Sequence, residues 1–302
     1  MLSFLPAPLI GVLSFLLYTI NTIFWAIPLL IFALLKWMLP IAVLRQAISC
    51  LLDSFATCWI GVNLFIQKLF IKTKIHVENL AQTNKKQRYL VISNHQSWVD
   101  IMLLQRIFHG QIPFLKFFLK KELIYVPVLG LAWWALDFPF MSRYSKNQIK
   151  KNPQLAGKDI QATRQACEKF KTMPVSIMNF VEGTRFSAEK CQRQRSPYKN
   201  LLKPKASGIA FVLSIMGDKL DCMLDVAISY NGNSPTFWEF LCGKVDSATI
   251  KIQSIKIDET LMGDYEGDKE FRVIFQRRIN EIWLEKDNWL ETHKNKASKN
   301  VS

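Results

Sequence analysis

The sequence predicts an α/β protein with a mixed sheet flanked by helices, preceded by membrane-embedded helices at the N-terminus. Three observations lead to this prediction. The first 35 residues contain no charged side chain. Beyond them, short apolar runs that end in polar or glycine-rich residues alternate with helical patterns, which is typical of an α/β domain. The net charge of +15 indicates an anionic partner: nucleic acid, an anionic membrane surface or a phosphate-bearing substrate.

The N-terminal segment contains a largely apolar, uncharged run of 27 residues, 9–35. A membrane-spanning helix needs about 20 apolar residues, so this run is long enough. A cleaved signal peptide has a positive n-region and a shorter apolar core, and neither is present here. Pro28 lies inside the run and either kinks one helix or divides two half-helices. We therefore predict one transmembrane or re-entrant helix.

A second apolar segment, residues 48–70, is interrupted by Asp53, Asn63 and Gln67. This pattern fits an amphipathic helix at the membrane interface or one half of a hairpin, and an ordinary core helix is the alternative. Positive charge starts at Lys36 and recurs through the following segments. The positive-inside rule then places the remainder of the chain in the cytoplasm.

The remainder of the chain shows strand and helix patterns in alternation. Five strands are predicted from apolar or alternating runs, at residues 74–77, 89–93, 175–181, 224–230 and 249–257. Three helices are predicted from apolar residues at helical spacing or from an apolar run that follows a turn, at residues 158–171, 203–216 and 269–292. In such sheets, functional residues gather beyond the carboxyl ends of the strands.

The predicted strand 89–93 ends in Asn94-His95, and Asp100 follows the histidine by five residues. A neutral imidazole can take a proton from an alcohol near neutral pH. A carboxylate on its other ring nitrogen fixes the tautomer and stabilises the imidazolium that forms. His95 and Asp100 fit such a pair across a strand-to-helix turn. Taken alone, Asp100 also fits an ordinary helix cap.

A second block, FVEGTRFS at residues 180–187, follows the predicted strand 175–181. Gly183 permits a tight turn. The Thr184 hydroxyl and the Arg185 guanidinium suit a phosphate group, and Glu182 is placed to orient Arg185. A glycine turn with a surface ion pair is the alternative interpretation.

Together the two blocks resemble the glycerolipid acyltransferase family, of the 1-acyl-sn-glycerol-3-phosphate acyltransferase type. The resemblance rests on Asn94-His95-x-x-x-x-Asp100, followed 87 residues after the histidine by Glu182-Gly183-Thr184-Arg185. The stretch KKELIYVPVLGLAWWALDFPFMSR is similar to the family's second block, which leads to an arginine, here Arg143.

A further stretch, LLKPKASGIAFVL at residues 201–213, is similar to a longer, membrane-anchored branch of that family. The resemblance covers roughly residues 74–232. The family's fourth block often ends a strand in proline, but the matching stretch here, residues 224–232, contains no proline. This departure concerns the acyl-donor end of the site.

The resemblance implies transfer of a fatty acyl group from a thioester to the sn-2 hydroxyl of lysophosphatidic acid, in phospholipid biosynthesis or remodelling. His95 would be the general base and Asp100 would hold it. The acceptor would be bound by Arg143, Glu182, Gly183, Thr184 and Arg185. Acyl-CoA or acyl carrier protein would be the donor, membrane lipid a partner, and no cofactor is expected. Glycerol-3-phosphate or another lysophospholipid is an alternative acceptor, and a catalytically silent membrane scaffold is the alternative of another class.

On this interpretation the chain divides into a membrane anchor, an acyltransferase domain and a disordered tail, at residues 1–72, 73–293 and 294–302. The stretch FLKFFLKKEL, residues 114–123, lines an acyl groove, dips into the membrane interface, or packs as a core helix whose lysines snorkel outward. Because the chain is short and shows no eukaryotic targeting motif, we expect a bacterial inner membrane with the domain facing the cytoplasm.

Two classes of function are disfavoured by the sequence. A nucleic-acid-binding protein would also be basic, but no zinc-finger, RNP or helix-turn-helix pattern is present, and a 27-residue apolar anchor fits it poorly. A structural metal site is not expected, because the six cysteines show no C-x-x-C spacing and no Cys/His cluster has zinc-ligand spacing. Reduced thiols in a cytosol-facing protein are expected instead.

Overall fold

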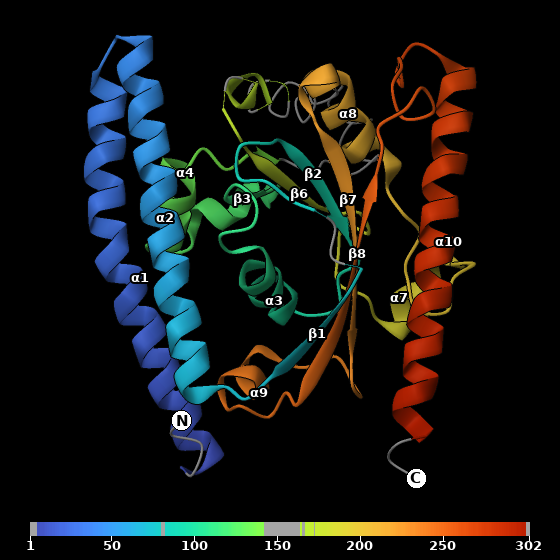
Figure 1. Cartoon of the computed structure of the whole chain (residues 1–302), viewed down its shortest axis with the longest axis horizontal. Helices are drawn as coiled ribbons and strands as arrows, with labels where there is room; N and C mark the ends of the chain where they lie inside the picture. Colours follow the sequence, from blue (N-terminus) through green and yellow to red (C-terminus); the bar gives the residue numbers. More distant parts are fainter. Residues whose placement is uncertain (1–4, 80–81, 142–163, 165–166, 172, 300–302) are drawn as a thin grey trace.

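The computed structural model describes residues 5–79, 82–141, 164, 167–171 and 173–299. A mixed sheet lies in the centre with helices on both of its faces (Figure 1). Two long helices, α1 (Ala7–Met38) and α2 (Ala42–Phe70), lie on the left in Figure 1, and α10 (Lys269–Lys299) lies on the right. The predicted α/β class, with a mixed sheet flanked by helices and two long apolar helices before it, is confirmed.

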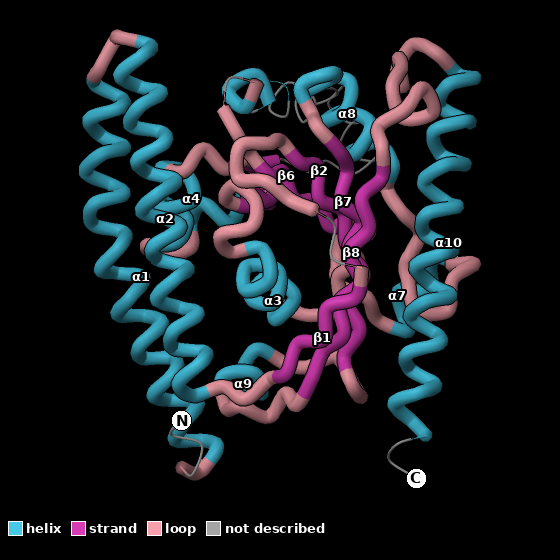
Figure 2. The backbone as a smooth tube through the Cα atoms, in the orientation of Figure 1, coloured by secondary structure: helices cyan, strands magenta, loops and turns pink. Residues whose placement is uncertain are grey.

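The central sheet is shown in magenta in Figure 2. Its strands are β1 (Lys74–Glu78), β2 (Tyr89–Ser93), β3 (Leu115–Phe117), β6 (Ser176–Phe180), β7 (Cys222–Tyr230) and β8 (Ser247–Ile255). Their order is β1-β8-β7-β2-β6-β3. β2 is parallel to both of its neighbours, β6 and β7, and β3 is parallel to β6. β8 runs antiparallel to β7 and parallel to β1, which makes the sheet mixed.

The five predicted strands are confirmed, each end within two residues of its predicted position. Three short strands were not predicted: β3, and the pair β4 (Leu119–Lys120) and β5 (Phe140–Met141), which form a separate two-stranded ladder. β3 and β4 fall in the Phe- and Lys-rich stretch 114–123, and η1 (Lys121–Tyr125) completes it as a 3-10 helix. The core-helix interpretation of that stretch is therefore wrong, because two- and three-residue strands are too short to show a period of two.

Side chains alternate between two cores on the two faces of the sheet. Along β2, Tyr89 and Val91 point to one core, and Leu90 and Ile92 point to the other. The first core is closed by α1, α2 and α3 (Val99–Phe108), and the second by α8 (Ala206–Met216) and α10. All five residues of β2 are buried, as expected for a central strand covered on both sides.

The predicted helices 203–216 and 269–292 correspond to α8 and α10. α10 continues through Lys299, so the predicted disordered tail begins as the last turns of this helix. Most of the predicted helix 158–171 lies outside the described residues, and of those described, 164 and 167–170 are helical. The remaining helices are short: α4 (Leu129–Ala135), α7 (Ala188–Gln194), α9 (Phe237–Leu241) and η3 (Gly217–Lys219).

The two N-terminal helices form an antiparallel hairpin (Figure 1). Both are long and apolar enough to cross a membrane by length and composition. Pro28 lies inside α1 and does not divide it. The polar residues of the second segment face inward rather than toward a membrane surface: Asn63 accepts a hydrogen bond from Asn21 Nδ2 at 2.9 Å. Of the three interpretations of residues 48–70, the structure shows the second, in which they form one half of a hairpin.

The hairpin packs against the α/β domain and is tied to it by two ion pairs. Lys36 of α1 pairs with Asp137, which follows α4. Asp53 of α2 pairs with Lys116 of β3 at 2.8 Å, and Lys116 Nζ also donates to the Leu136 carbonyl at 2.8 Å. Lys116 is therefore buried, and the interpretation in which the lysines of this stretch point outward does not hold for it, because a carboxylate from α2 pairs with it inside the protein.

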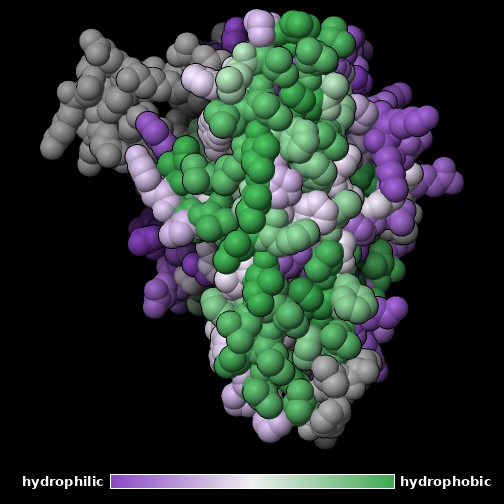
Figure 3. All heavy atoms as spheres, turned by 90° about the vertical axis from the view of Figure 1, so that its left-hand side faces the viewer, coloured by the Kyte–Doolittle hydropathy of each residue, from purple (hydrophilic) through white to green (hydrophobic). Residues whose placement is uncertain are grey.

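The opposite side of the hairpin is apolar and exposed (Figure 3). Large apolar side chains of α1 point outward along almost its whole length, at Leu9, Val12, Phe15, Leu16, Ile20, Ile23, Phe24, Ile27, Ile31, Leu34, Leu35, Trp37 and Met38. We call these residues the α1 apolar face. Exposed patches of this size on a soluble protein mark sites of contact with a membrane or a partner.

Candidate active site

The candidate site lies where three parallel strands end. β2, β6 and β7 are neighbours in the sheet, so their carboxyl ends meet at one edge. The loop after β2 carries His95, and the loop after β6 carries Glu182. Asn94 extends the pairing of β2 with β7 beyond the ladder, because its side chain donates to the Ile228 carbonyl at 3.0 Å and accepts from the Ile228 N–H at 2.9 Å. The histidine that follows is thereby fixed relative to the sheet.

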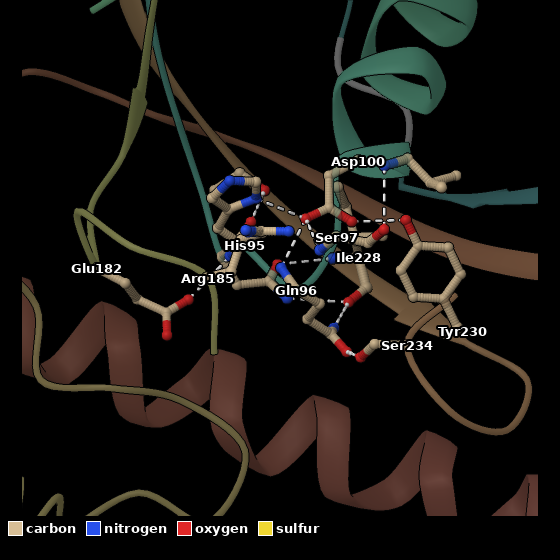
Figure 4. A network of polar contacts seen from close by, with 12 residues as sticks. His95, Gln96, Ser97, Asp100, Glu182, Arg185, Ile228, Tyr230 and Ser234 are labelled. Carbon is tan, nitrogen blue, oxygen red and sulfur yellow. Dashed lines mark hydrogen bonds and ion pairs between the residues drawn. The ribbon is translucent and has the colours of Figure 1, made fainter. Parts of the chain in front are cut away.

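The predicted pair of His95 and Asp100 is formed (Figure 4). His95 Nδ1 lies 2.8 Å from Asp100 Oδ2. An ionised carboxylate only accepts, so Nδ1 carries the proton and Nε2 is left as the nitrogen that can accept one. The His95 side chain is 12% exposed and that of Asp100 is completely buried. The imidazole therefore stands between the protein interior and the surface, as a general base that meets a substrate must.

Three further contacts hold the imidazole ring and its carboxylate. The ring of His95 stacks on that of Phe180, the last residue of β6, with centroids 3.9 Å apart and planes 14° apart. Asp100 Oδ2 accepts from the backbone N–H groups of Gln96 and Ser97 at 2.6 and 2.9 Å. Asp100 is the second residue of α3, so its charge lies at the positive end of the helix dipole while its two backbone hydrogen bonds hold the turn that carries His95.

Sequence reasoning missed Tyr230, the last residue of β7. Its hydroxyl donates to Asp100 Oδ1 at 2.5 Å, and both residues are buried (Figure 4). The available signal was its position at the carboxyl end of the predicted strand 224–230, beside the strand that ends at His95. Nothing in the local pattern links it to an aspartate 130 residues earlier in the chain.

Glu182 is placed differently from the prediction. Its carboxylate is fully buried and bridges two backbone N–H groups, that of His95 at 2.9 Å and that of Leu202 at 2.8 Å. Burial raises the pKa of Glu182 to about 7, although both N–H donors and the nearby Lys286 act to lower it. These contacts take the carboxylate away from Arg185, so the prediction that Glu182 orients Arg185 is wrong. Glu182 instead anchors the backbone of the catalytic histidine candidate.

Arg185 is exposed at the rim of the site. Its guanidinium lies over the indole ring of Trp98, 5.3 Å from the centroid, in a cation–π contact. Thr184 Oγ1 accepts from Lys190 Nζ at 3.0 Å. The predicted phosphate-binding residues Thr184 and Arg185 thus lie on the loop that runs beside His95, whereas Arg143 lies outside the described residues.

Gly183 is required by the shape of this loop. Its φ of +68° lies in the left-handed region, and a Cβ there would come within 2.9 Å of Lys205 Nζ. Lys205 precedes α8, and its N–H donates to the Val181 carbonyl at 2.9 Å. The turn at Gly183 therefore lets the loop after β6 fold back closely on the start of α8.

A buried ion pair joins β7 to α10 beneath these loops. Lys286 Nζ lies 2.7 Å from Asp225 Oδ1 and donates to the Val226 carbonyl at 2.9 Å. The ammonium also lies 4.3 Å from the centroid of the Trp283 ring. Within the described part of the chain, no group of three or more His, Cys, Asp or Glu side chains is arranged to hold a metal ion.

Comparison with known proteins agrees with this geometry. The family model described as Acyltransferase matches residues 74–214. The "Probable 1-acyl-sn-glycerol-3-phosphate acyltransferase 5" of Arabidopsis thaliana is 26% identical over 238 residues, which cover 74% of this chain and 60% of that protein. The "2-acyl-1-lysophosphatidylinositol acyltransferase" of Saccharomyces cerevisiae is 24% identical over 249 residues, covering 69% and 62%. The chain thus spans about 60% of the length of these two relatives.

Among solved structures, the crystal structure of the 1-acyl-sn-glycerophosphate (LPA) acyltransferase of Thermotoga maritima is similar, with a TM-score of 0.49 at 18% identity. The alignment covers 91% of this chain and 95% of that one. The match to the family model includes the His95–Asp100 pair and the loop from Glu182 to Arg185. By these residues and this match, residues 74–214 of the chain are similar to the glycerolipid acyltransferase family.

Proposed function

We propose that the protein transfers a fatty acyl group from an acyl thioester to the sn-2 hydroxyl of lysophosphatidic acid, which gives phosphatidic acid. The observation that carries the proposal is the His95–Asp100 pair at the edge of the sheet, with Nδ1 bonded to the carboxylate and Nε2 left to act as a base. The family supports acyl transfer as the reaction class. The name of the Arabidopsis relative supports lysophosphatidic acid as the acceptor.

The site can perform this reaction without a covalent enzyme intermediate. Nε2 of His95 takes the proton of the acceptor hydroxyl as its oxygen attacks the thioester carbonyl carbon. The tetrahedral intermediate then expels the thiolate as the C–S bond breaks, and the imidazolium returns the proton to the thiolate sulfur. Asp100 stabilises the imidazolium between these steps. The sequence contains no G-x-S-x-G nucleophile elbow, in agreement with direct transfer.

Arg185 is suited to bind the phosphate of the acceptor. Its guanidinium is exposed and held at the rim by Trp98 rather than by an acidic side chain among the contacts described. Arginine binds phosphate through paired hydrogen bonds, and a flat stacking partner leaves those donors available. Arg143 is proposed as the second phosphate ligand on the resemblance alone. Acyl-CoA or acyl carrier protein is proposed as the donor, without a cofactor.

A lysophospholipid with a larger headgroup is the second candidate acceptor. The yeast relative, which matches at similar identity, is named for lysophosphatidylinositol. An exposed phosphate-binding arginine at the rim leaves space for a headgroup beyond the phosphate. The phosphate would then be a diester, which still offers Arg185 two oxygens.

A thiol-release assay with purified protein in detergent tests the proposal. Acyl-CoA or acyl carrier protein thioester is supplied with lysophosphatidic acid, lysophosphatidylinositol, glycerol-3-phosphate or no acceptor. We expect free thiol to appear with lysophosphatidic acid and phosphatidic acid to form in equal amount. Acceptor-independent release would indicate a thioesterase, and no release with any donor and acceptor would favour the silent scaffold.

We also propose that the hairpin holds the protein on a membrane through the α1 apolar face. Both ends of α1 touch the domain: a Cβ on Gly11 would lie 2.5 Å from Cys242 Sγ after α9, and Lys36 pairs with Asp137. If α1 crossed a bilayer fully, the domain beside it would be drawn into the lipid. The contacts favour a hairpin lying in the membrane surface with the domain above it. The bacterial inner membrane and the cytoplasmic side remain predictions.

Charged substitutions on the α1 apolar face should release the protein from vesicles. Burying a large apolar side chain contributes about 1.5–3 kcal/mol, so Ile20→Asp with Phe24→Asp should weaken binding at least about tenfold. The measurement is flotation with phosphatidylcholine vesicles that contain phosphatidic acid. The control is Val273→Asp with Leu284→Asp, which are also exposed but lie on α10 at the other side of the molecule. Equal loss in both variants would contradict the proposal.

A further inference from the structure

Asp100 receives its hydrogen bonds from two different parts of the fold. Oδ2 is held by the His95 ring and by the backbone N–H groups of Gln96 and Ser97, all within the loop before α3. Oδ1 is held by Tyr230, which belongs to β7. The two oxygens of one carboxylate thus face the catalytic loop and the sheet, respectively.

Tyr230 is built to remain a donor. Its side chain is buried, with the residue only 4% exposed, and its hydroxyl lies 2.5 Å from Oδ1. Burial, and then the negative charge of Asp100, raise the pKa of Tyr230 well above its ordinary value. The phenol therefore stays protonated wherever the enzyme is folded, and the carboxylate keeps a neutral donor on the side away from His95.

The end of β7 is also fixed against the catalytic loop by other contacts. Asn94 makes two hydrogen bonds with Ile228, and Gln96 Nε2 donates to the same Ile228 carbonyl at 2.7 Å. Ser97 Oγ donates to the carbonyl of Pro235 in the loop after β7. The end of β7 that carries Tyr230 is therefore fixed relative to Asp100. This suits a group that must hold the carboxylate in one orientation.

We propose that Tyr230 is a positioning residue for acyl transfer, acting through Asp100 rather than touching the substrate. It holds the carboxylate so that Oδ2 faces Nδ1 of His95, and it draws negative charge toward Oδ1. The inference rests on the proposed function. A carboxylate that shares its charge with a donor attracts a neighbouring imidazolium less, so removal of the Tyr230 hydroxyl should strengthen the attraction between Asp100 and a protonated His95.

Tyr230→Phe tests this inference, because it removes the hydroxyl and keeps the ring. We expect kcat to fall about 10–100-fold, as for loss of a hydrogen bond to a charged group, while KM for donor and acceptor changes less than about twofold. The acidic limb of the pH–rate profile should move to higher pH, because the unshared carboxylate stabilises the imidazolium more. The other charged groups around the pair, Glu182, Arg185 and Lys286, are unchanged in the variant.

The matched control is Tyr89→Phe on the neighbouring strand. The Tyr89 ring is also buried and its hydroxyl donates to Gln87 at 2.5 Å, but Tyr89 begins β2 at the opposite end from the site. The Tyr89→Phe variant should be less stable than the wild type, and its pH–rate profile should not shift. If Tyr230→Phe is too unstable to assay, 3-fluorotyrosine at position 230 keeps the shape and strengthens the donor, and it should move the acidic limb to lower pH.

The outcomes separate the inference from the proposed function. An active wild type whose Tyr230→Phe variant keeps full activity, or loses it equally at every pH, overturns the positioning role. An acidic limb that stays in place with 3-fluorotyrosine also overturns it. A wild type without acceptor-dependent thiol release overturns the proposed function, and the inference falls with it.

Discussion

His95→Ala is expected to lower acceptor-dependent acyl transfer by about 10²–10⁴-fold, the range that general base catalysis contributes. Nε2 is the atom that takes the proton from the acceptor hydroxyl, and alanine offers no replacement. The fold should persist, because the imidazole lies at the sheet edge and Asp100 keeps the backbone donors of Gln96 and Ser97 and the hydroxyl of Tyr230. The measurement is kcat for thiol release in the presence of lysophosphatidic acid.

A matched control is available in His76→Ala, since His76 is an exposed histidine of β1 at the far edge of the sheet. It should retain wild-type kcat. The thermal unfolding midpoints of both variants should remain close to that of the wild type. If His95→Ala keeps more than about a tenth of wild-type activity, His95 is not the base, because a general base contributes at least about 10²-fold.

The largest effect on stability is expected at Lys286. Its ammonium is completely buried and pairs with Asp225 at 2.7 Å, an aspartate that is itself almost fully buried. Lys286→Met leaves that carboxylate in the protein interior without its hydrogen-bonded counter-charge, so we expect a loss of about 3–5 kcal/mol in the free energy of unfolding. The measurement is the urea unfolding midpoint in detergent, with the slope checked for two-state behaviour.

Two comparison variants identify the cause of this loss. Replacing both partners, in Lys286→Met with Asp225→Leu, should recover at least half of it, because a buried pair exchanged for apolar side chains is often neutral. Lys199 is an exposed lysine that pairs with Glu291 of α10. Lys199→Met should therefore lower the free energy of unfolding by no more than about 1 kcal/mol. A small loss for Lys286→Met, equal to that for Lys199→Met, would show that the buried pair is not needed.

The parts of the fold that sequence predicts well are those whose patterns are local. β2, β6 and β7 are apolar runs that end in polar residues, so the strands and the positions of His95 and Glu182 beyond them follow from the sequence. The spacing of five between His95 and Asp100 spans one strand-to-helix turn, and the pair forms as predicted. Short strands such as β3 carry too few residues to show any period.

The parts that sequence does not predict are contacts between distant segments. Glu182 was assigned to its neighbour Arg185, but its carboxylate is bound by backbone N–H groups 87 residues before it and 20 residues after it. One interpretation of residues 114–123 placed the lysines at the surface, but Asp53 lies 63 residues before Lys116 and pairs with it in the interior. Tyr230 meets Asp100 across the sheet. Such partners are set by strand order, which no local pattern encodes.

The ion pair between Asp53 and Lys116 has a consequence for how the protein matures. The hairpin supplies Leu29, Leu52 and Phe70 to the same core that contains Val91 of the central strand. The hairpin is thus a structural part of the α/β domain and not a detachable segment. Docking of the hairpin completes one face of the sheet, so assembly of the hairpin and assembly of the catalytic edge are steps of one folding process.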